Sequence, residues 1–420
     1  MGGPAGEPAV RGAARSRGTA CRIAAAGLVA AAILAAGPAP AHAVACPPAE
    51  EPRYESTGLP AAGFPNDPLY ALQHNLRTIR VPQAWRRGFL GRGATIAIVD
   101  SGIDPEHPEF RGRLLPGADP FEQQPGKVDC PEGPVAEADG HGVGVAGVAA
   151  AAAHNGIGLA GVAPRALVLP VRVFDDVEGG ESPQAMAAGI RFAADRGADV
   201  INASFTAGVP PADRAEAVAN RLGVQVLERD LAALEDAVDH AWRKGSVVVA
   251  AAGNTSPGVP QATDAPICAS PARFRHVVCV VATEGDGSPS PFSHLPVRED
   301  GGLTLAAPGF NRSPLVDCTA IVTTWPGTMA FENPNPLHGP DCGRLPRGYT
   351  WRGFTSQAAP QVSGVLALLR AAGVGRDEAL ERLRRTTANG GEWHPLTGHG
   401  LIDAEAALAG VQPHDRDARR

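Results

Sequence analysis

The amino-acid sequence predicts an α/β protein with a mostly parallel central sheet and helices on both faces of that sheet. Short runs of apolar and β-branched residues recur along the chain, which is typical of strands buried on both sides. Segments with helical spacing of apolar residues lie between these runs, and a repeated strand, helix, strand order favours parallel strands. The chain has 420 residues, of which 44% are hydrophobic and 19% charged, so it is long enough to bury such a core.

Five short apolar runs are predicted as strands. They are ATIAIVD (94–100), ALVLPVRVF (166–174), DVINASF (199–205), SVVVAAAGN (246–254) and HVVCVVA (276–282). Two segments between them, residues 182–197 and 233–245, have helical spacing and end in glycine, a common helix stop. Because ligands of parallel sheets bind at the carboxyl ends of the strands, functional residues are expected directly after these runs.

Asp100 and Asn254 stand at such positions, and His141 lies in a segment between the first two runs. Asp100 ends the first run, where a carboxylate needs a partner or forms a turn onto Gly102. His141 lies between two glycines, just before an Ala-rich apolar segment that is predicted as a helix. Asn254 ends the fourth run. Taken one at a time, Asp100 and Asn254 are explained as turn residues and His141 as a structural histidine, although its flanking glycines leave room for the ring to face a cleft.

Ser356 lies in RGFTSQAAPQVSG (352–364), just before the apolar segment VLALL. Taken alone, this stretch predicts an ordinary N-cap, because serine is a favoured capping residue. Together with Asp100, His141 and Asn254, it forms a set of side chains that fit the roles of one catalytic mechanism. The serine would be the nucleophile and the histidine the general base and then the acid, while the aspartate would stabilise the imidazolium and the asparagine would donate to the oxyanion.

The order Asp, His, Ser with these flanking residues resembles the subtilisin-like serine peptidases, the subtilase family. Further segments are similar to family motifs in the same order: FPNDPLYALQHNLRTIRVPQAW (64–85), GVAP (161–164), LAAPG (305–309, a loop in the family) and GHGLIDAEAAL (398–408). The resemblance implies a subtilisin-like three-layer fold and serine endopeptidase activity. It makes Asp100, His141 and Ser356 the catalytic triad and Asn254 the oxyanion donor.

The resemblance also implies an arrangement of domains. A catalytic domain would span residues 66–412, after a short N-terminal extension (46–65) and before a polar tail (413–420).

The same resemblance implies where a substrate binds. An extended protein or peptide substrate would pair as an added strand with the segment of Ser204, Phe205 and Thr206, a mode of main-chain recognition. Ala252 and Gly253 would wall the pocket for the residue before the scissile bond. Because both are small and uncharged, we expect an apolar or permissive pocket.

A structural calcium ion is a further implication of the resemblance. The segment HNGIGLAGVAP (154–164) is similar to a family loop that lends an asparagine side chain and two carbonyl oxygens to Ca²⁺. The implied ligands are Asp67, Glu109, Asn155, Ile157 and Leu159. Oxygen ligands of this kind suit a hard cation, but an Asn-Gly pair is also a common turn that needs no metal.

The sequence departs from the family pattern near the nucleophile and the histidine. Phe354 stands where the family has glycine, directly before the Thr-Ser pair. Val143 and Gly144 replace a threonine and a histidine, and Gln361 replaces another histidine. These departures motivate a second hypothesis, a catalytically silent peptide-binding protein on the same scaffold. A third, a dinucleotide-binding oxidoreductase, lacks a G-x-G-x-x-G motif after the first strand.

The N-terminal residues predict export. Arginines precede the apolar run IAAAGLVAAAILAAG (23–37), and PAPAHAVA (38–45) offers cleavage sites after Ala43 or Ala45, which together indicate a signal peptide over residues 1–45. The run is shorter than the ~20 residues of a spanning helix, so we expect cleavage, no membrane span afterwards, and a secreted protein. A lipid anchor on Cys46 is the alternative.

The cysteine count agrees with export. Of seven cysteines, one lies in the signal segment, and the remaining even set favours disulfides in an oxidising compartment. The connectivity does not follow from the sequence. The pairs that flank short segments are Cys268 with Cys279 and Cys318 with Cys342, which would leave Cys46 with Cys130.

The charge pattern restricts the partners. The formal net charge is −7, and no basic stripe runs along the chain, so no nucleic-acid partner is expected. Protein or peptide substrates are the expected partners. No feature of the sequence defines an oligomer, and a monomer is the default expectation.

Overall fold

The computed structural model describes most of the predicted catalytic domain. The described residues are 64–118, 140–174, 183–207, 228–255, 268–297, 302–310, 320–327 and 345–413, without the side chains of 228–230. The predicted signal peptide, nearly all of the N-terminal extension and the tail after residue 413 lie outside these ranges and remain predictions. No helix within the ranges is long and apolar enough to cross a membrane.

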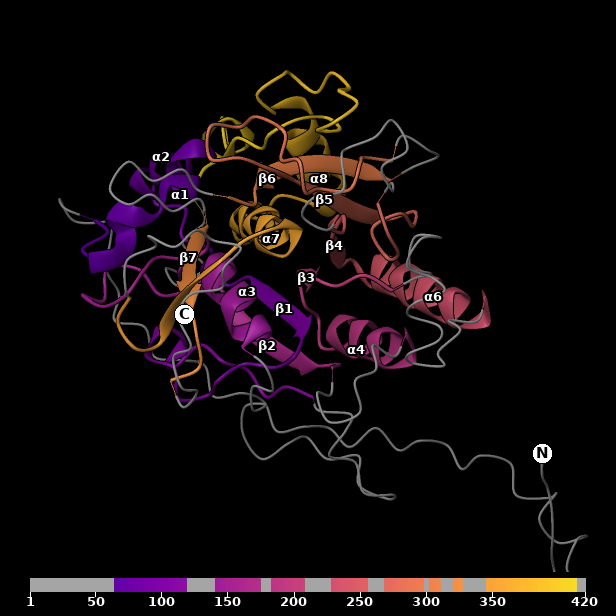
Figure 1. The fold of residues 1–420 in the computed structure, drawn as a ribbon, viewed down its shortest axis with the longest axis horizontal. Coiled ribbons are helices and arrows are strands. Elements are labelled where there is room, and N and C mark those ends of the chain that lie inside the picture. The colour runs from indigo at the N-terminus through magenta and orange to yellow at the C-terminus, as the bar shows by residue number, and fades with distance from the viewer. Residues whose placement is uncertain are drawn as a thin grey trace, which may run out of the picture. The chain divides into compact units, whose positions relative to one another are not determined.

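A six-stranded parallel sheet forms the centre of the fold, with the strand order β2-β1-β3-β4-β5-β6 (Figure 1). Its strands are β1 (Thr95–Asp100), β2 (Leu167–Arg172), β3 (Val200–Ala203), β4 (Val247–Ala251), β5 (Val277–Thr283) and β6 (Leu303–Pro308). The five predicted strands are all present, and the predicted fold class is confirmed. The chain runs outward from β1 to β2 and returns to β3 on the other side of β1. The carboxyl ends of β1 and β3 therefore flank a topological switch point, where α/β proteins bind ligands.

The expectation of a loop over residues 305–309 is wrong. Leu305, Ala306, Ala307 and Pro308 belong to strand β6, which pairs with β5. Leu305, Ala306 and Ala307 are completely buried. Apolar side chains on both faces of a strand are what a sheet covered by helices on each side requires.

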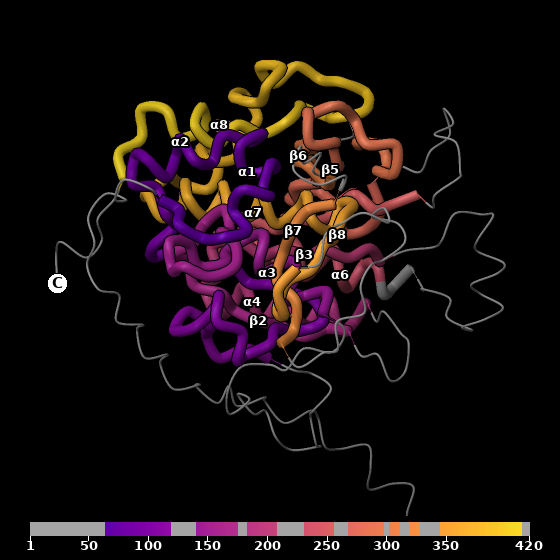
Figure 2. The backbone as a smooth tube through the Cα atoms, turned by 60° about the vertical axis from the view of Figure 1, so that its left-hand side comes forward, coloured from indigo at the N-terminus to yellow at the C-terminus, as the bar shows by residue number. Residues whose placement is uncertain are grey.

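The helices cover both faces of the sheet (Figures 1 and 2). Helices α3 (His141–Ala150) and α7 (Thr355–Ala371) share one apolar core with Ile96 and Ile98 of β1. On the other face, α4 (Pro183–Asp195) and α6 (Glu228–Lys244) share a core with Ala97 and Val99. Successive β1 side chains thus enter different cores, which is why the strand reads as a continuous apolar run.

Smaller elements surround these three layers. They are η1 (Pro68–Leu72), α1 (His74–Thr78), α2 (Val81–Arg86), η2 (Pro108–Phe110), α8 (Arg376–Arg385) and α9 (Ala404–Ala407). The disulfide Cys268–Cys279 is present, whereas the other four cysteines of the predicted mature chain lie outside the described residues.

An antiparallel pair of strands that the sequence analysis did not predict packs against α3. It consists of β7 (Ile321–Thr324) and β8 (Tyr349–Arg352). The hydroxyls of Thr323 and Thr324 donate to the carbonyls of Gly144 and Val143, each at 2.5 Å. Since β8 ends at Arg352, only four residues before Ser356, this pair links the start of α3 to the start of α7.

The close approach of β7 and α3 predicts opposite effects of two substitutions on one helix. A Cβ atom at Gly147 would overlap Thr324 Oγ1 and lie 2.8 Å from Thr323 Oγ1, whereas at Gly144 the nearest atom would be an ordinary 3.4 Å away. Gly147→Ala should lower the free energy of unfolding by about 1–3 kcal/mol through overpacking. Gly144→Ala should leave it within about 0.5 kcal/mol or raise it, because alanine favours helix. Urea unfolding measures both, and equal losses would contradict the packing.

Candidate active site

Asp100 and His141 form a hydrogen-bonded pair at the carboxyl end of β1. The Asp100 side chain has no exposed surface, and His141 Nδ1 lies 2.6 Å from its Oδ1. The N–H of Ser101 donates to the same oxygen at 2.8 Å. With Nδ1 directed at the carboxylate, the ring carries Nε2 on its opposite side. The carboxylate thus has the partner that its burial requires, and the imidazole is oriented by it.

Glycines allow the start of α3 to reach this position. His141 is the first residue of α3, and its N-cap Gly140 has φ +80°, a left-handed conformation that suits glycine. A Cβ atom at Gly142 would overlap the carbonyl oxygen of Gly102, directly after β1. The Gly-His-Gly sequence is therefore required by the close contact between α3 and the end of β1.

Ser356 is the second residue of α7 and not its cap. The N-cap is Phe354, and no side-chain cap hydrogen bond is formed there. The expectation of a capping serine is therefore wrong. Ser356 Oγ donates to the Ser204 carbonyl at 3.3 Å, and Ser204 Oγ donates to the Ser356 carbonyl at 3.0 Å. The nucleophile candidate is thus held beside the segment that follows β3.

The two pairs lie on neighbouring strand ends. Strand β1, which ends at Asp100, pairs with β3, which ends one residue before Ser204. Neighbouring strands are about 4.8 Å apart. The Asp100–His141 pair and the Ser204–Ser356 pair therefore lie at the carboxyl ends of adjacent strands, beside the switch point of the sheet.

Buried polar residues that the sequence analysis missed fix α7 on β3. Ser363 Oγ donates to Asn202 Oδ1 at 2.8 Å, and Asn202 Nδ2 donates to Ser204 Oγ at 2.9 Å. Ser363 and Asn202 have no exposed surface. The available signal was the spacing of Ser356 and Ser363, which are seven residues apart and so share one face of the helix.

Asn254 is exposed, and its amide is oriented by Thr355, the residue before Ser356. Asn254 Oδ1 accepts hydrogen bonds from the backbone N–H of Thr355 at 3.0 Å and from its hydroxyl at 2.9 Å. Because both donors of Thr355 bind the amide oxygen, the Nδ2 amino group is directed away from Thr355. The amide thus presents its donors on the open side. Thr355, which the sequence analysis did not single out, sets this orientation.

Phe354 takes the backbone conformation that a glycine would supply. Its φ is +71° and its ψ −172°, a region in which a side chain costs about 1–3 kcal/mol. Its ring packs edge-on against Phe292 and Phe310, with centroids 5.7 and 5.4 Å apart. These aromatic contacts, each worth about 0.5–1.5 kcal/mol, offset the strain. The helix therefore starts at Thr355 in spite of the substitution.

The departure at Gln361 has a packing explanation. Gln361 is fully buried, and its amide donates to the carbonyls of Pro308 and Gln357 and accepts from Asn75. It connects α1, β6 and α7 without reaching the Asp100–His141 pair.

The predicted substrate segment presents its backbone rather than its side chains. Ser204 and Phe205 are 4% and 5% exposed, and the Phe205 ring packs against Phe174, so neither side chain is available to a ligand. Thr206 is half-buried. The structure places this segment beside Ser356, through Ser204.

The predicted pocket wall has a histidine behind it. Ala252 is fully buried, and Gly253 has φ +104°. A Cβ atom at Gly253 would overlap the imidazole of His294, and the backbone N–H of His294 donates to the Gly253 carbonyl at 3.0 Å. The sequence analysis missed His294, because nothing in its local sequence connects it to the site.

The five predicted calcium ligands lie together but do not fit a cation. The N–H of Asn155 donates to Asp67, at 3.2 Å. Glu109 accepts from Leu159 N at 3.1 Å and from Asn155 Nδ2 at 2.8 Å, and Asn155 Oδ1 accepts from Ile157 N. Ca²⁺ needs oxygen ligands directed at it, whereas this loop directs N–H donors at the two carboxylates. Burial also raises the pKa of Glu109 to about 7.

Comparisons with known proteins identify the family of the chain. Residues 91–400 match the family model described as the subtilase family. The chain belongs to the subtilase family. This subtilase is 34% identical to thermitase of Thermoactinomyces vulgaris over 310 residues, which cover 74% of this chain and 86% of thermitase. It is 30% identical to subtilisin Savinase of Lederbergia lenta over 331 residues, or 78% of this chain and 96% of that protein.

The solved structures show the same relationship. A protease of Pseudoalteromonas arctica superimposes on this subtilase with a TM-score of 0.60 and 26% identity, covering 82% of this chain and 98% of that one. Family membership and these relatives make the protein a serine-type endopeptidase.

His294 gives this subtilase a predictable response to acid. Burial lowers the pKa of His294 below its ordinary value, and the nearby carbonyl oxygens of Asn254 and Ala252 raise it only in part. The unfolded chain therefore takes up the proton more readily, so the free energy of unfolding should fall as the pH falls below about 6.5. His294→Leu should make the urea midpoint less dependent on pH between about pH 7 and pH 5. If the urea midpoints of the wild type and of His294→Leu change equally with pH, His294 is not the source of the acid sensitivity.

Proposed function

We propose that this endopeptidase is exported and cleaves peptide bonds with Asp100, His141 and Ser356 as its catalytic triad and Asn254 as its oxyanion donor. The observation that supports the proposal is the position of two residue pairs at adjacent strand ends, beside the switch point. The imidazole of His141 is oriented by a buried carboxylate, and the hydroxyl of Ser356 is held on the neighbouring strand end.

In the proposed mechanism, Ser356 Oγ attacks the carbonyl carbon of the scissile bond and its proton passes to His141 Nε2. Asp100 stabilises the imidazolium that results. When the tetrahedral intermediate collapses, the C–N bond breaks and His141 gives the proton to the leaving amine. A water molecule, activated by the same imidazole, then releases the acyl group and regenerates Ser356.

The developing oxyanion is stabilised by fixed donors. The amino group of Asn254 is directed to the open side because Thr355 holds the amide oxygen. The backbone N–H of Ser356, in the first turn of α7, adds a second donor together with the helix dipole. Donors that are already oriented need no rearrangement during the reaction, so they favour the transition state over the substrate.

The substrate is an extended protein or peptide segment. It pairs with the backbone of Ser204, Phe205 and Thr206, and because the side chains of Ser204 and Phe205 are buried, main-chain groups are the means of recognition. The wall of Ala252 and Gly253 favours an apolar residue before the scissile bond. Calcium is not part of the proposal, because the loop that would hold it offers donors where oxygen ligands are needed.

Export is supported by the sequence of residues 1–45 and by the even set of cysteines after it.

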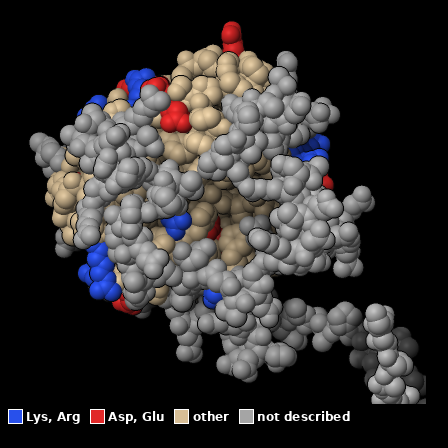
Figure 3. All heavy atoms as spheres, in the orientation of Figure 1, with Lys and Arg blue, Asp and Glu red and all other residues tan. Residues whose placement is uncertain are grey.

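The alternative of a catalytically silent scaffold is disfavoured, because Phe354 keeps the backbone conformation of a glycine and Gln361 has a packing role. On the face in Figure 3, the basic and acidic side chains of the described residues form small separate groups.

Labelling with a fluorophosphonate, which reacts with activated serines, tests the nucleophile. The wild type should be labelled and Ser356→Ala should not. Asn254→Ala should lower kcat about 10²- to 10³-fold on a peptide substrate, the usual loss for one oxyanion donor. Ser288→Ala, on an exposed turn, is the control and should behave as the wild type. A folded wild type that takes no label would refute the proposed function.

The orientation of Asn254 by Thr355 can be tested separately. Thr355→Val removes the hydroxyl that donates to Asn254 Oδ1 but keeps the size of the side chain. We expect kcat to fall about tenfold, the effect of one neutral hydrogen bond, with KM unchanged. Thr355→Ser keeps the hydroxyl and should restore most of the rate. A Val variant as fast as the wild type would mean that the backbone N–H of residue 355 orients the amide by itself.

A further inference from the structure

The Glu109 side chain receives three hydrogen bonds from two other parts of the chain. It has no exposed surface, and it lies in η2, nine residues after Asp100. Its Oε1 accepts from Tyr349 Oη at 2.9 Å and from Leu159 N at 3.1 Å. Its Oε2 accepts from Asn155 Nδ2 at 2.8 Å. A buried carboxyl is unfavourable without such donors, so the side chain binds these segments together.

Each of the three segments continues from one arm of the proposed catalytic triad. Glu109 is on the chain that leaves β1 after Asp100. The loop with Asn155 and Leu159 follows α3, which begins with His141. Tyr349 is the first residue of β8, which leads to Ser356.

A second hydrogen-bonded link runs parallel to the first. His107, beside η2, accepts from Glu109 N through Nδ1 at 3.3 Å, and its Nε2 lies 2.8 Å from the carbonyl oxygen of Gly348. The His107 and Tyr349 rings meet edge to face at 5.6 Å. The segment after β1 and the start of β8 are therefore joined on both sides of Tyr349.

The space between the loop and the carboxylate is filled by protein atoms. A Cβ atom at Gly158, which has φ +45°, would overlap both Tyr349 Oη and Glu109 Oε1. The loop thus approaches as closely as a glycine permits. The Tyr349 ring is 5% exposed and packs in a small core with Leu69, Leu159 and Trp351. The phenol oxygen stands beside the carboxylate where the sequence analysis expected a cation.

We propose that Glu109, Tyr349, Asn155 and Leu159 form a clamp that works without a metal ion and positions the three arms of the triad. The phenol hydroxyl and the N–H groups of the loop donate hydrogen bonds to the Glu109 carboxylate. These bonds hold the loop in place, which is the role that was expected of calcium. Glu109 and Tyr349 are positioning residues, because they act through the segments that carry Asp100, His141 and Ser356. This role rests on the proposed function, whereas independence from calcium does not.

Calcium itself is the first probe, with thermal unfolding and calorimetry as readouts. The midpoint of the wild type should be the same, within about 1 °C, in millimolar CaCl₂ and in EDTA, since a ligand that stabilises only the folded state shifts the midpoint with its concentration. Titration calorimetry with CaCl₂ should show no saturable binding at this loop. A calcium-dependent rise of the midpoint that EDTA reverses and that Glu109→Ala abolishes would overturn the proposal. These measurements do not depend on enzymatic activity.

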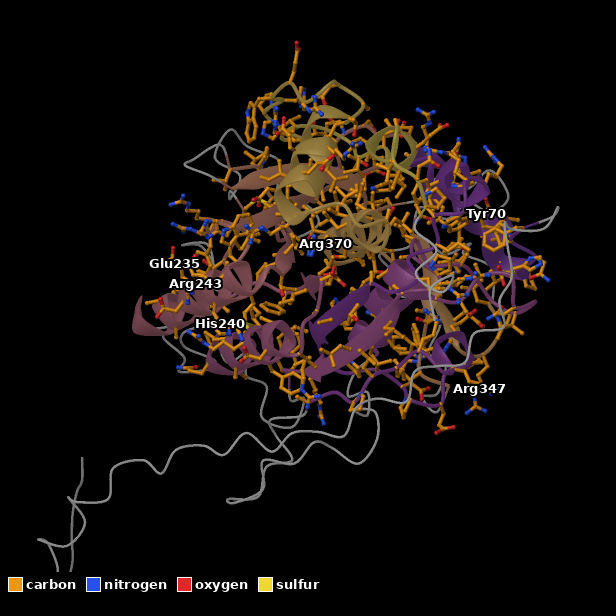
Figure 4. All side chains as sticks on the ribbon, turned by 180° about the vertical axis from the view of Figure 1, so that it is seen from behind. Tyr70, Glu235, His240, Arg243, Arg347 and Arg370 are labelled. Atoms are coloured by element: carbon orange, nitrogen blue, oxygen red, sulfur yellow. A yellow bond between two sulfur atoms is a disulfide. The ribbon has the colours of Figure 1, made fainter. Side chains whose placement is uncertain are left out.

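The second probe is Tyr349→Phe, which removes only the hydroxyl. Its matched control is Tyr70→Phe, the same change at the tyrosine of η1, which lies at the periphery of the structure (Figure 4). Tyr349→Phe should lower the thermal midpoint by about 2–6 °C, a shift of the size that follows from losing one hydrogen bond in a protein this large. It should also lower kcat and the rate of fluorophosphonate labelling about three- to tenfold with KM unchanged, while Tyr70→Phe should change none of these quantities.

The outcomes separate the clamp from the proposed function. A lower midpoint with unchanged kcat and labelling rate would show a purely structural contact and refute the positioning role. An unchanged midpoint and unchanged kcat would refute the clamp altogether. A wild type that takes no label would refute the proposed function, and the calcium and midpoint measurements would still decide whether the clamp exists.

Discussion

The buried carboxylate of Asp100 determines how the site is built. A charged group without exposed surface is unfavourable unless donors reach it, and the imidazole of His141 is one of them. For the ring to come within hydrogen-bond distance, the first turn of α3 has to pack against the chain after β1, and Gly142 allows this because any side chain there would overlap the carbonyl of Gly102. The position of α3 then sets that of β7, whose two threonines bond its first turn. Strand β7 pairs with β8, and β8 leads directly to the start of α7, so the position of α3 also influences the position of Ser356.

The sheet could be predicted from the sequence for a physical reason. Strands covered by helices on both faces are apolar at every position, so β1, β4 and β5 stand out as continuous runs. Strands β7 and β8 do not, since each has only four residues, polar and apolar side chains are mixed in them, and they pair across a long interval of chain. The residues after the predicted strands could be identified as site candidates because parallel sheets bind their ligands at the carboxyl ends of the strands.

Contacts between distant segments limited the prediction of the site. Nothing in the loop after α3 reveals that Tyr349 supplies a hydroxyl to Glu109, so the loop alone was compatible with calcium. Thr355 could be recognised only once its bond to the Asn254 oxygen was visible, and His294 only once its ring was found behind Gly253. In each case the sequence shows the residue type, but the residue that it contacts lies far away along the chain.

The hydrogen bonds of the site join residues that are far apart along the chain. The separation is 41 residues for Asp100 and His141, 152 for Ser204 and Ser356, and 240 for Glu109 and Tyr349. Such contacts form slowly, because the entropy of closing long loops is lost before the contacts contribute. The proposed catalytic centre is therefore complete only after these distant segments have come together. A chain that is still folding has no complete peptidase site with which to cut its neighbours.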